Sequence, residues 1–246
     1  MRKYIRIKIA KLIPSLYPSL RNIDVFVSGL LGRVHENEFL MLKKEVPKKS
    51  IVIDIGANLG QSITSIAKVC RPSQIIAFEC NPNCINSLYR IGKINTLLRG
   101  IKFSIINKAL GDFCHSFNFM VPTVGGVEYI QEGFLEGTIV NQKTISSRLK
   151  CDVSELGYIV QKVSVDMLDK YNFNPGLIKI DVQGAELSVL KGAINTIAKC
   201  KPILFIELPD DDGERSKLLL FIEERLNYDA IDVGTNCLCK PKKFNP

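Results

Sequence analysis

Three acidic residues lie near or directly after the ends of short apolar runs in this chain of 246 residues, and they are the first candidates for chemistry. Asp54 lies in the run 51–55, Glu79 ends the run 75–78, and Asp181 ends the run 177–180. Short β-branched runs of this kind are typical of buried parallel strands. Open α/β sheets bind ligands at the carboxyl ends of their strands. The sequence therefore predicts that these three carboxylates converge on one crevice.

A glycine turn follows the first of these strands. Gly56 and Gly60 separate the strand from a helical pattern that begins at Gln61, where apolar residues recur at spacings of three and four. Glycine lets the backbone come close to a ligand, and the first turn of a helix offers unpaired N–H groups. A strand, a glycine turn and a helix in this order indicate a cradle for a nucleotide-like ligand.

The position of the acid relative to the glycines favours one ligand class. The turn reads Asp54-x-Gly56-x-x-x-Gly60, whereas a dinucleotide-binding turn reads G-x-G-x-x-G. A carboxylate here would repel a pyrophosphate but attract the ammonium and sulfonium groups of S-adenosylmethionine. The pattern favours this methyl donor over a nicotinamide cofactor, and any α/β protein with a glycine turn is the remaining alternative.

Two further acids are candidates for the nucleoside part of the donor. Glu79 follows Asp54 by 25 residues, a position suited to accepting hydrogen bonds from both ribose hydroxyls. Alternatively, Glu79 caps a helix that starts near Asn81. Asp112 follows a third predicted strand, at 102–107, and either approaches the adenine edge or makes a turn.

The second strand–turn–helix pattern supplies the catalytic candidate. Asp181 ends its strand and could orient an acceptor hydroxyl and take its proton, or hold the donor's amino group. Four other residues are weaker candidates for the base: Glu186, Glu207, His35 and His115. Glu186 could equally lie on a helix surface, and Glu207 could equally cap a strand.

The remaining segments suggest one interrupted α/β domain. Between 113 and 169 the pattern changes to three short strands, HSFNFMV, GTIVNQ and YIVQKVSV, around a loop that contains glycines. We expect this inserted hairpin region to recognise the acceptor. A strand from Pro202, a helix at 216–226 and a closing segment at 230–238 complete the predicted sheet.

Positive charge is concentrated at the N-terminus. The net charge is +8, and residues 1–50 contain 11 Lys/Arg against 4 Asp/Glu. Apolar residues from Ile5 to Leu20 follow helical spacing, although Pro14 and Pro18 interrupt it. This segment either rests on an anionic membrane surface or is a solvated helix that covers the core. The nearly neutral body lacks a nucleic-acid-binding signature, so no nucleic-acid partner is expected.

The eight cysteines are dispersed, and their spacing fits neither a disulfide framework nor a metal site. We expect reduced thiols, no metal, and a cytoplasmic protein that is peripheral to the membrane if its N-terminus binds lipid. No stretch approaches the length of a membrane span, and no signal peptide is recognisable.

Five motifs in order resemble the FkbM family of S-adenosylmethionine-dependent methyltransferases: VIDIGANLGQS, IIAFECNPN, NKALGD, KIDVQGAELSVLKGA and PILFIEL. The resemblance implies a class I methyltransferase fold at 50–246, after a basic helical extension at 1–49. Its sheet would have seven strands, parallel except for the last-inserted one. It also implies methylation of a hydroxyl on a sugar, lipid-linked glycan or polyketide. A binding protein that has lost catalysis is the alternative from another class.

The resemblance also implies roles for residues of the cradle. Asp54, Gly56 and Gly60 would hold the donor's amino-acid part, and Asn58 would make a backbone or carboxylate contact. Glu79 would bind the ribose, with Asn81 among the cofactor-binding residues. Two positions depart from the family pattern, because Cys80 replaces a common proline and Gln183 replaces a frequent acid. Gln183 is therefore not assigned a role in proton transfer.

Overall fold

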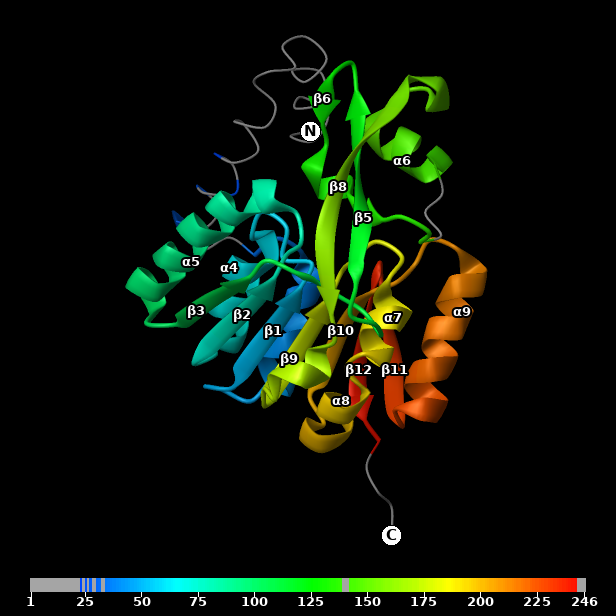
Figure 1. The fold of residues 1–246 in the computed structure, drawn as a ribbon. Helices are drawn as coiled ribbons and strands as arrows, with labels where there is room; N and C mark the ends of the chain where they lie inside the picture. The colour runs from blue at the N-terminus through cyan, green and yellow to red at the C-terminus, as the bar shows by residue number, and fades with distance from the viewer. Residues whose placement is uncertain are drawn as a thin grey trace.

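Seven strands form the central sheet of the computed structural model, which describes residues 34–138 and 142–242 and five single positions between 23 and 31. The strand order is β11-β12-β10-β9-β1-β2-β3 (Figure 1). The strands are β1 (Ile51–Ile55), β2 (Gln74–Phe78), β3 (Lys102–Ile106), β9 (Pro175–Ile180), β10 (Ile203–Glu207), β11 (Tyr228–Val233) and β12 (Asn236–Pro241).

The direction of the strands confirms the predicted fold class. β10, β9, β1, β2 and β3 pair in parallel with one another in this order, while β12 runs antiparallel to both β10 and β11. The one antiparallel strand is therefore inserted last, between β10 and β11. Parallel strands buried on both faces explain why these segments read as almost continuous apolar runs.

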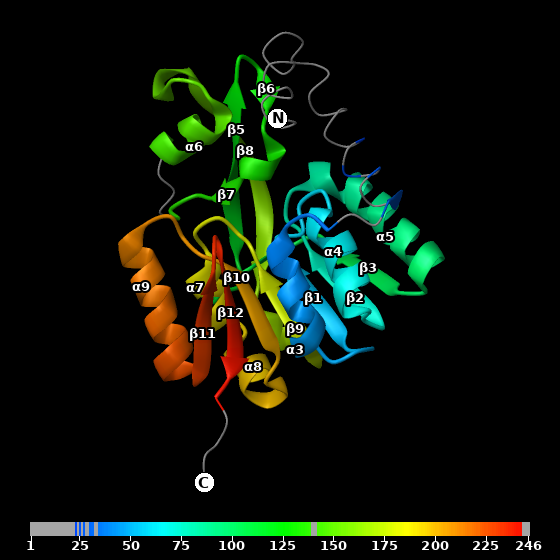
Figure 2. The same ribbon diagram turned by 180° about the vertical axis from the view of Figure 1, so that it is seen from behind.

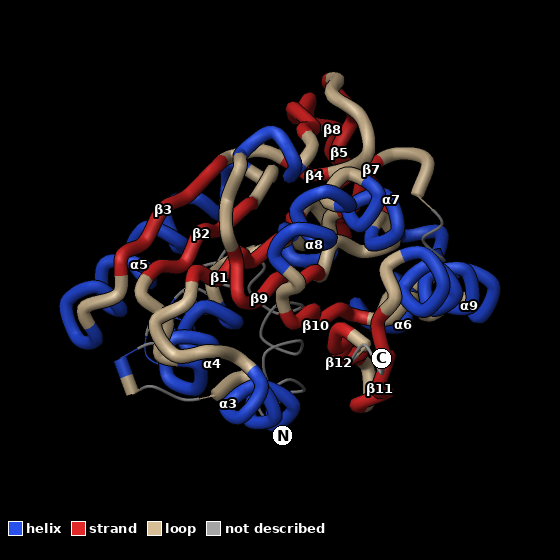
Figure 3. Tube along the Cα trace, turned by 90° about the horizontal axis from the view of Figure 1, so that it is seen from below, coloured by secondary structure: helices blue, strands red, loops and turns tan. Residues whose placement is uncertain are grey.

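Helices cover both faces of the sheet (Figures 2 and 3). One face packs against η2 (Asn37–Met41), α3 (Leu42–Glu45), α4 (Gln61–Cys70) and α5 (Ile85–Arg99). The short η3 (Pro82–Cys84) directly precedes α5. The other packs against α7 (Glu186–Lys191), α8 (Ile194–Cys200), α9 (Asp212–Leu220) and the π-helical η7 (Phe221–Arg225). Alternate residues of β1 serve the two faces, since Val52 joins the first core while Ile53 and Ile55 join the second.

The insertion is a long antiparallel hairpin that rises from the carboxyl edge of the sheet (Figure 1). β5 (Ser116–Val124) pairs with β8 (Leu156–Asp166) from Ser116↔Ser164 to Val124↔Leu156. The short elements around it are β4 (Ala109–Leu110), β6 (Val127–Glu128), η4 (Ile130–Glu132), β7 (Phe134–Leu135), α6 (Gln142–Leu149), η5 (Val153–Glu155) and η6 (Leu168–Tyr171). The predicted strand GTIVNQ is wrong at its described residues, because Gly137 lies in a turn and Gln142 begins α6.

The predicted amphipathic segment at Ile5–Leu20 lies outside the described residues, so its association with lipid stays a prediction. Within the described part of the chain, no helix combines the length and apolar character needed to cross a membrane. A helical segment made of η2 and α3 precedes the first strand.

Contact between α5 and β3 depends on a glycine. A Cβ at Gly92 would lie 1.9 Å from Cδ1 of Phe103. We expect Gly92→Ala to lower the free energy of unfolding by about 1–2 kcal/mol, because overpacking outweighs the better helix propensity of alanine. Urea unfolding measures this change. The control Leu97→Ala, on the exposed side of α5, should stay within about 0.5 kcal/mol of wild type. Equal stabilities of the two variants would contradict the packing argument.

Candidate active site

Two adjoining pockets open at the carboxyl edge of the sheet. The first has a volume of about 60 Å³ and is lined largely by apolar residues of β1, β2, β4 and the insertion. The second has a volume of about 350 Å³ and is lined largely by polar and charged residues. Four residues line both pockets: Gly56, Asn58, Asp181 and Gln183. The predicted crevice is thus present, and it has an apolar half and a polar half.

The glycine turn brings the backbone of β1 against that of β9. Gly56 has a φ of +76°, and a Cβ there would lie 1.8 Å from the carbonyl oxygen of Asp181. Only glycine fits this combination of conformation and close approach. Gly60, with a φ of +94°, directly precedes α4 and faces Ile91. Both glycines therefore have structural reasons for their positions, and Gly56 also lines the crevice.

Glu79 holds the turn to the end of β2. Its Oε2 accepts a hydrogen bond from the backbone N–H of Asn58 at 2.7 Å, and its Oε1 accepts one from the N–H of Asn81 at 2.7 Å. Burial raises the pKa of Glu79, and these two hydrogen bonds oppose that rise. A carboxyl oxygen can accept more than one hydrogen bond, so Glu79 retains acceptor capacity toward the apolar pocket that it lines.

Asp54 lies beneath the crevice. Its side chain is 0% exposed, accepts a hydrogen bond from Ser62 Oγ at 2.6 Å, and lies 3.2 Å from the ammonium of Lys179. The Lys179 contact is an ion pair without hydrogen-bond alignment. Because Asp54 lines neither pocket, direct contact with a donor's ammonium group, as predicted from the sequence, has no support in this geometry.

Lys179 joins the two acids that the sequence placed at strand ends. Its ammonium lies 3.2 Å from Asp54 Oδ1 and 3.1 Å from Asp181 Oδ2, and it donates to the carbonyl oxygen of Gly56 at 3.2 Å. Burial by itself lowers the pKa of Lys179, but the carboxylates of Asp181 and Asp54 raise it above its usual value. Lys179 is therefore a permanent buried cation.

Asp181 is the acid that faces the crevice. Its side chain is 37% exposed, in contrast to Asp54. Burial favours the neutral form, but the nearby Lys179 ammonium lowers the pKa of Asp181 to about 2. Glu207, at the end of β10, lines the polar pocket. Burial and, to a smaller extent, the negative charge of Asp181 raise the pKa of Glu207 to about 10.

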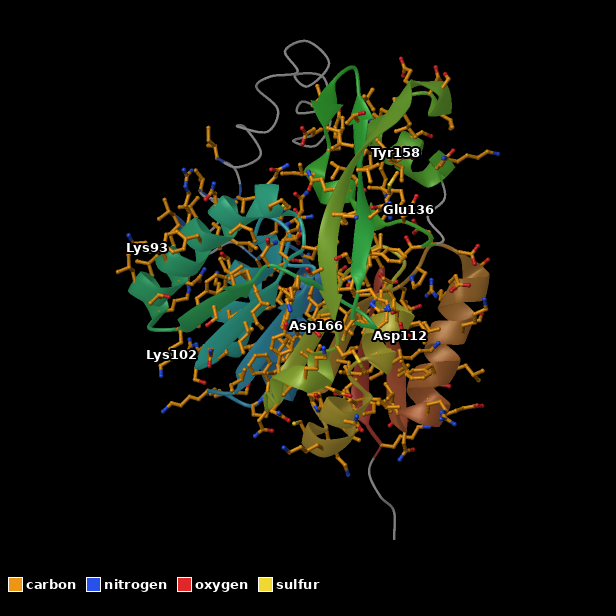
Figure 4. All side chains as sticks on the ribbon, in the orientation of Figure 1. Lys93, Lys102, Asp112, Glu136, Tyr158 and Asp166 are labelled. Atoms are coloured by element: carbon orange, nitrogen blue, oxygen red, sulfur yellow. The ribbon has the colours of Figure 1, made fainter. Side chains whose placement is uncertain are left out.

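Several predicted residues lie elsewhere. Asp112 is exposed and accepts a hydrogen bond from Ser188 Oγ of α7 at 2.7 Å, so the geometry supports its turn role and not the adenine contact (Figure 4). Asn81 is buried and caps η3, where its Oδ1 accepts from the N–H of Asn83. His115 is exposed on the insertion and lines neither pocket, whereas His35 lines the polar pocket.

Glu186 is neither a surface residue nor a lining residue. It is 3% exposed, and its carboxylate accepts hydrogen bonds from the backbone N–H groups of Gly184 and Val182. Burial raises the pKa of Glu186, and these hydrogen bonds oppose that rise. The helix-surface alternative is therefore wrong, and Glu186 holds the turn that follows Asp181.

Three basic residues were missed by the sequence analysis. Lys179 could have been noticed, since a lysine within the apolar strand LIKI is unusual unless it is paired. Arg148 of α6 reaches the polar pocket and lies 2.9 Å from Asp210 and 3.3 Å from Glu132. Lys108 lines the apolar pocket and lies 2.8 Å from Asp166, at the lower end of β8 (Figure 4). Neither Arg148 nor Lys108 carries a local sequence signal.

We expect Lys179→Met to lower the free energy of unfolding by about 3–5 kcal/mol at neutral pH, because the buried Asp54 loses its countercharge. The loss should shrink in acid. The pKa of Asp181 is about 2 in the folded protein and about 4 in the unfolded chain, so its ionised carboxylate stabilises wild type above about pH 4. This contribution disappears as the pH falls from about 4 to 2.

Urea unfolding at pH 7 and pH 3 measures both effects. Lys191→Met, at an exposed position of α7, is the matched control and should stay close to wild type at both pH values. A Lys179→Met protein as stable as this control would show that the ion pairs contribute nothing.

Known proteins resemble this chain in sequence and in fold. Residues 54–230 match the family described as the methyltransferase FkbM domain. Methyltransferase sdnD of Sordaria araneosa is 23% identical over 192 residues, which cover 73% of this chain and 74% of sdnD. The crystal structure of methyltransferase FkbM from Methylobacillus flagellatus superposes with a TM-score of 0.52 at 16% identity. That match covers 92% of this chain and 60% of the other, so this chain spans less than two thirds of that protein.

Proposed function

Because the chain belongs to the FkbM methyltransferase family, we propose that it transfers the methyl group of S-adenosylmethionine to a hydroxyl oxygen of a sugar, glycan or similar hydroxyl-rich acceptor. The observation that carries the proposal is the division of the crevice. An apolar pocket beside Glu79 adjoins a polar pocket that contains Asp181 and Glu207. The first suits a nucleoside donor and the second a hydrophilic acceptor.

The residues of the apolar half fit the donor. Phe78, Leu110 and Phe119 provide apolar walls for an adenine ring, and Glu79 offers acceptor positions to ribose hydroxyls. Gly56 lines this pocket and, without a Cβ, lets the turn pack closely against the backbone of Asp181. Asp54 lies behind this half and acts indirectly, through its ion pair with Lys179.

The polar half suits a neutral acceptor that is rich in hydroxyls. Its acidic residues are Glu36, Glu132, Asp181 and Glu207, and Thr235 and Asn236 add neutral polar groups. Carboxylate and amide oxygens accept hydrogen bonds from hydroxyls. The two strong cations of the pocket, Lys179 and Arg148, are each paired with carboxylates, so a polyanionic acceptor such as a nucleic acid would find little free positive charge. The acceptor chemistry predicted from the sequence is therefore retained in this proposal.

S-Adenosylmethionine supplies a methyl group on a sulfonium, whose C–S electrons pass to sulfur as the new C–O bond forms. The protein's part is to orient the acceptor, exclude water and receive a proton. Asp181 stays ionised at neutral pH, because its pKa is about 2. It is a weak base, so it orients the hydroxyl first and takes the proton as the oxygen becomes strongly acidic during methylation.

Donor binding tests the apolar half. We expect Glu79→Ala to weaken S-adenosylmethionine binding by about ten- to a hundredfold, because hydrogen bonds to a charged group are worth about 1.5–3 kcal/mol. Titration calorimetry measures the affinity, and circular dichroism shows whether the variant is folded. Asp112→Ala, outside both pockets, should bind like wild type. Unchanged affinity in folded Glu79→Ala would remove Glu79 from the donor site.

Transfer of a labelled methyl group tests the reaction. We expect the protein to label a sugar, a glycan or another hydroxyl-bearing metabolite in cell extracts, and Asp181→Asn to reduce labelling by about 100-fold or more. Label in nucleic acid or at nitrogen would contradict the proposed acceptor. Binding of S-adenosylmethionine without labelled product would favour a protein that has lost catalysis. Binding of NAD in its place would favour an oxidoreductase.

A further inference from the structure

One glutamine connects both carboxyl groups of the polar pocket to an arginine. Gln183 Nε2 donates to Glu207 Oε2 at 3.0 Å and approaches Asp181 Oδ1 at 3.4 Å. Its Oε1 accepts a hydrogen bond from Arg148 Nη1 at 3.0 Å. Gln183 stands in the turn after β9 with a φ of +53°, a conformation that non-glycine residues adopt infrequently. From this uncommon backbone conformation, the side chain of Gln183 contacts three partners.

The amide chemistry of Gln183 matches these partners. A glutamine side chain has both N–H donors and a carbonyl acceptor, so it can satisfy two carboxyl groups and a guanidinium together. An ionised glutamate could accept from Arg148 but could donate to neither Asp181 nor Glu207. It would also place a third carboxylate in a partly buried site. This departure from the family pattern therefore has a geometric explanation.

Resting on the proposed methyl transfer, we propose that Asp181, Gln183 and Glu207 form one proton-holding unit. Gln183 positions the two carboxyl groups, Asp181 carries the negative charge toward the acceptor hydroxyl, and Glu207 carries a proton. Asp181 is the catalytic residue of this unit. Gln183 and Glu207 act through it and are positioning residues.

The surrounding charges decide where the proton resides. Lys179 lies 3.1 Å from Asp181 and keeps that carboxyl ionised. Glu207 is largely buried and faces the charge of Asp181, both of which favour its neutral form, while Lys179 and Arg148 oppose this effect. Arg148 is itself paired with Glu132 and Asp210. The other charged or titratable lining groups of the pocket are His35 and Glu36.

The proton balance of the reaction follows from this distribution. As the acceptor oxygen bonds to the methyl carbon, its O–H bond breaks and the proton passes to a carboxylate oxygen of Asp181. The proton then leaves to solvent through the open pocket, which restores the ionised Asp181. Glu207 keeps its own proton throughout. Its neutral state avoids a second negative charge beside Asp181.

Stability as a function of pH tests the unit without any methyl transfer. The pKa of Glu207 is raised to about 10 in the folded protein, so its contribution to stability is present in acid and falls as the pH rises toward 10. We expect the stability of wild type to decline relative to Glu207→Gln between about pH 5 and 9, since glutamine has no proton to lose. Parallel stability curves would overturn the protonated state of Glu207. Glu224→Gln, at an exposed position of η7, is the control and should run parallel to wild type.

Exchange of the amide and acid tests the positioning role. We expect Gln183→Glu to reduce kcat by about 100-fold with little change in donor affinity, because a third carboxyl group then replaces the N–H donor to Asp181 and Glu207. The double variant Gln183→Glu/Glu207→Gln restores one amide and two carboxyl groups, and should recover about tenfold of the loss. A double variant no better than Gln183→Glu would show that Gln183 has only a structural role and overturn the proposal.

The pH dependence of kcat gives a second readout. Wild-type activity should fall as the pH rises through about 10, because ionised Glu207 then repels Asp181, and Glu207→Gln should lack this fall. The same alkaline fall in both proteins would overturn the role of Glu207. If no acceptor is ever methylated, the proposed function fails, while the stability curves still decide whether the pair holds one proton.

Discussion

The buried ammonium of Lys179 is the interaction on which the site depends. Lys179 and Asp54 are direct partners in the register between β9 and β1, so their charges meet across neighbouring strands. The same ammonium binds the carbonyl oxygen of Gly56 and the carboxylate of Asp181. One cation thus connects the first strand, the glycine turn and the exposed acid. A partner left alone in this buried position would be strongly destabilising, which explains why these groups occur together.

The inserted hairpin contributes to both halves of the crevice. Phe119 of β5 and Leu135 of β7 line the apolar half, where they face the ends of β1 and β2. Arg148 of α6 lines the polar half and links the insertion to Gln183 and Asp210. A class I sheet without such an insertion would leave its carboxyl edge open. The insertion therefore shapes the apolar pocket and the polar pocket together.

The arrangement also separates structural from chemical carboxylates. Asp54 and Glu186 are buried and use their oxygens to hold strands and turns, whereas Glu79 holds the glycine turn and also lines the apolar pocket. Asp181 is the one of the predicted strand-end acids whose side chain is substantially exposed to the crevice. Similar residues at similar sequence positions thus perform different tasks, because neighbouring cations and backbone N–H groups differ from strand to strand.

The sequence by itself determined the fold and the location of the candidate site. Alternation of apolar runs and helical spacing predicts parallel strands, and parallel strands bring Asp54, Glu79 and Asp181 to one edge. The glycine turn was also readable, because Gly56 stands where the chain changes period. These features are local patterns or follow directly from parallel topology.

Only the tertiary structure decided which acids face the two pockets and which side chains pair with them. The contact between Arg148 and Asp210 joins residues 62 positions apart, and no local pattern predicts it. Burial of Asp54 against Lys179, and the turn role of Asp112 at Ser188, likewise depend on how whole elements pack. A sequence pattern places a residue at the end of a strand, but exposure and countercharge are set by segments that are distant in the chain.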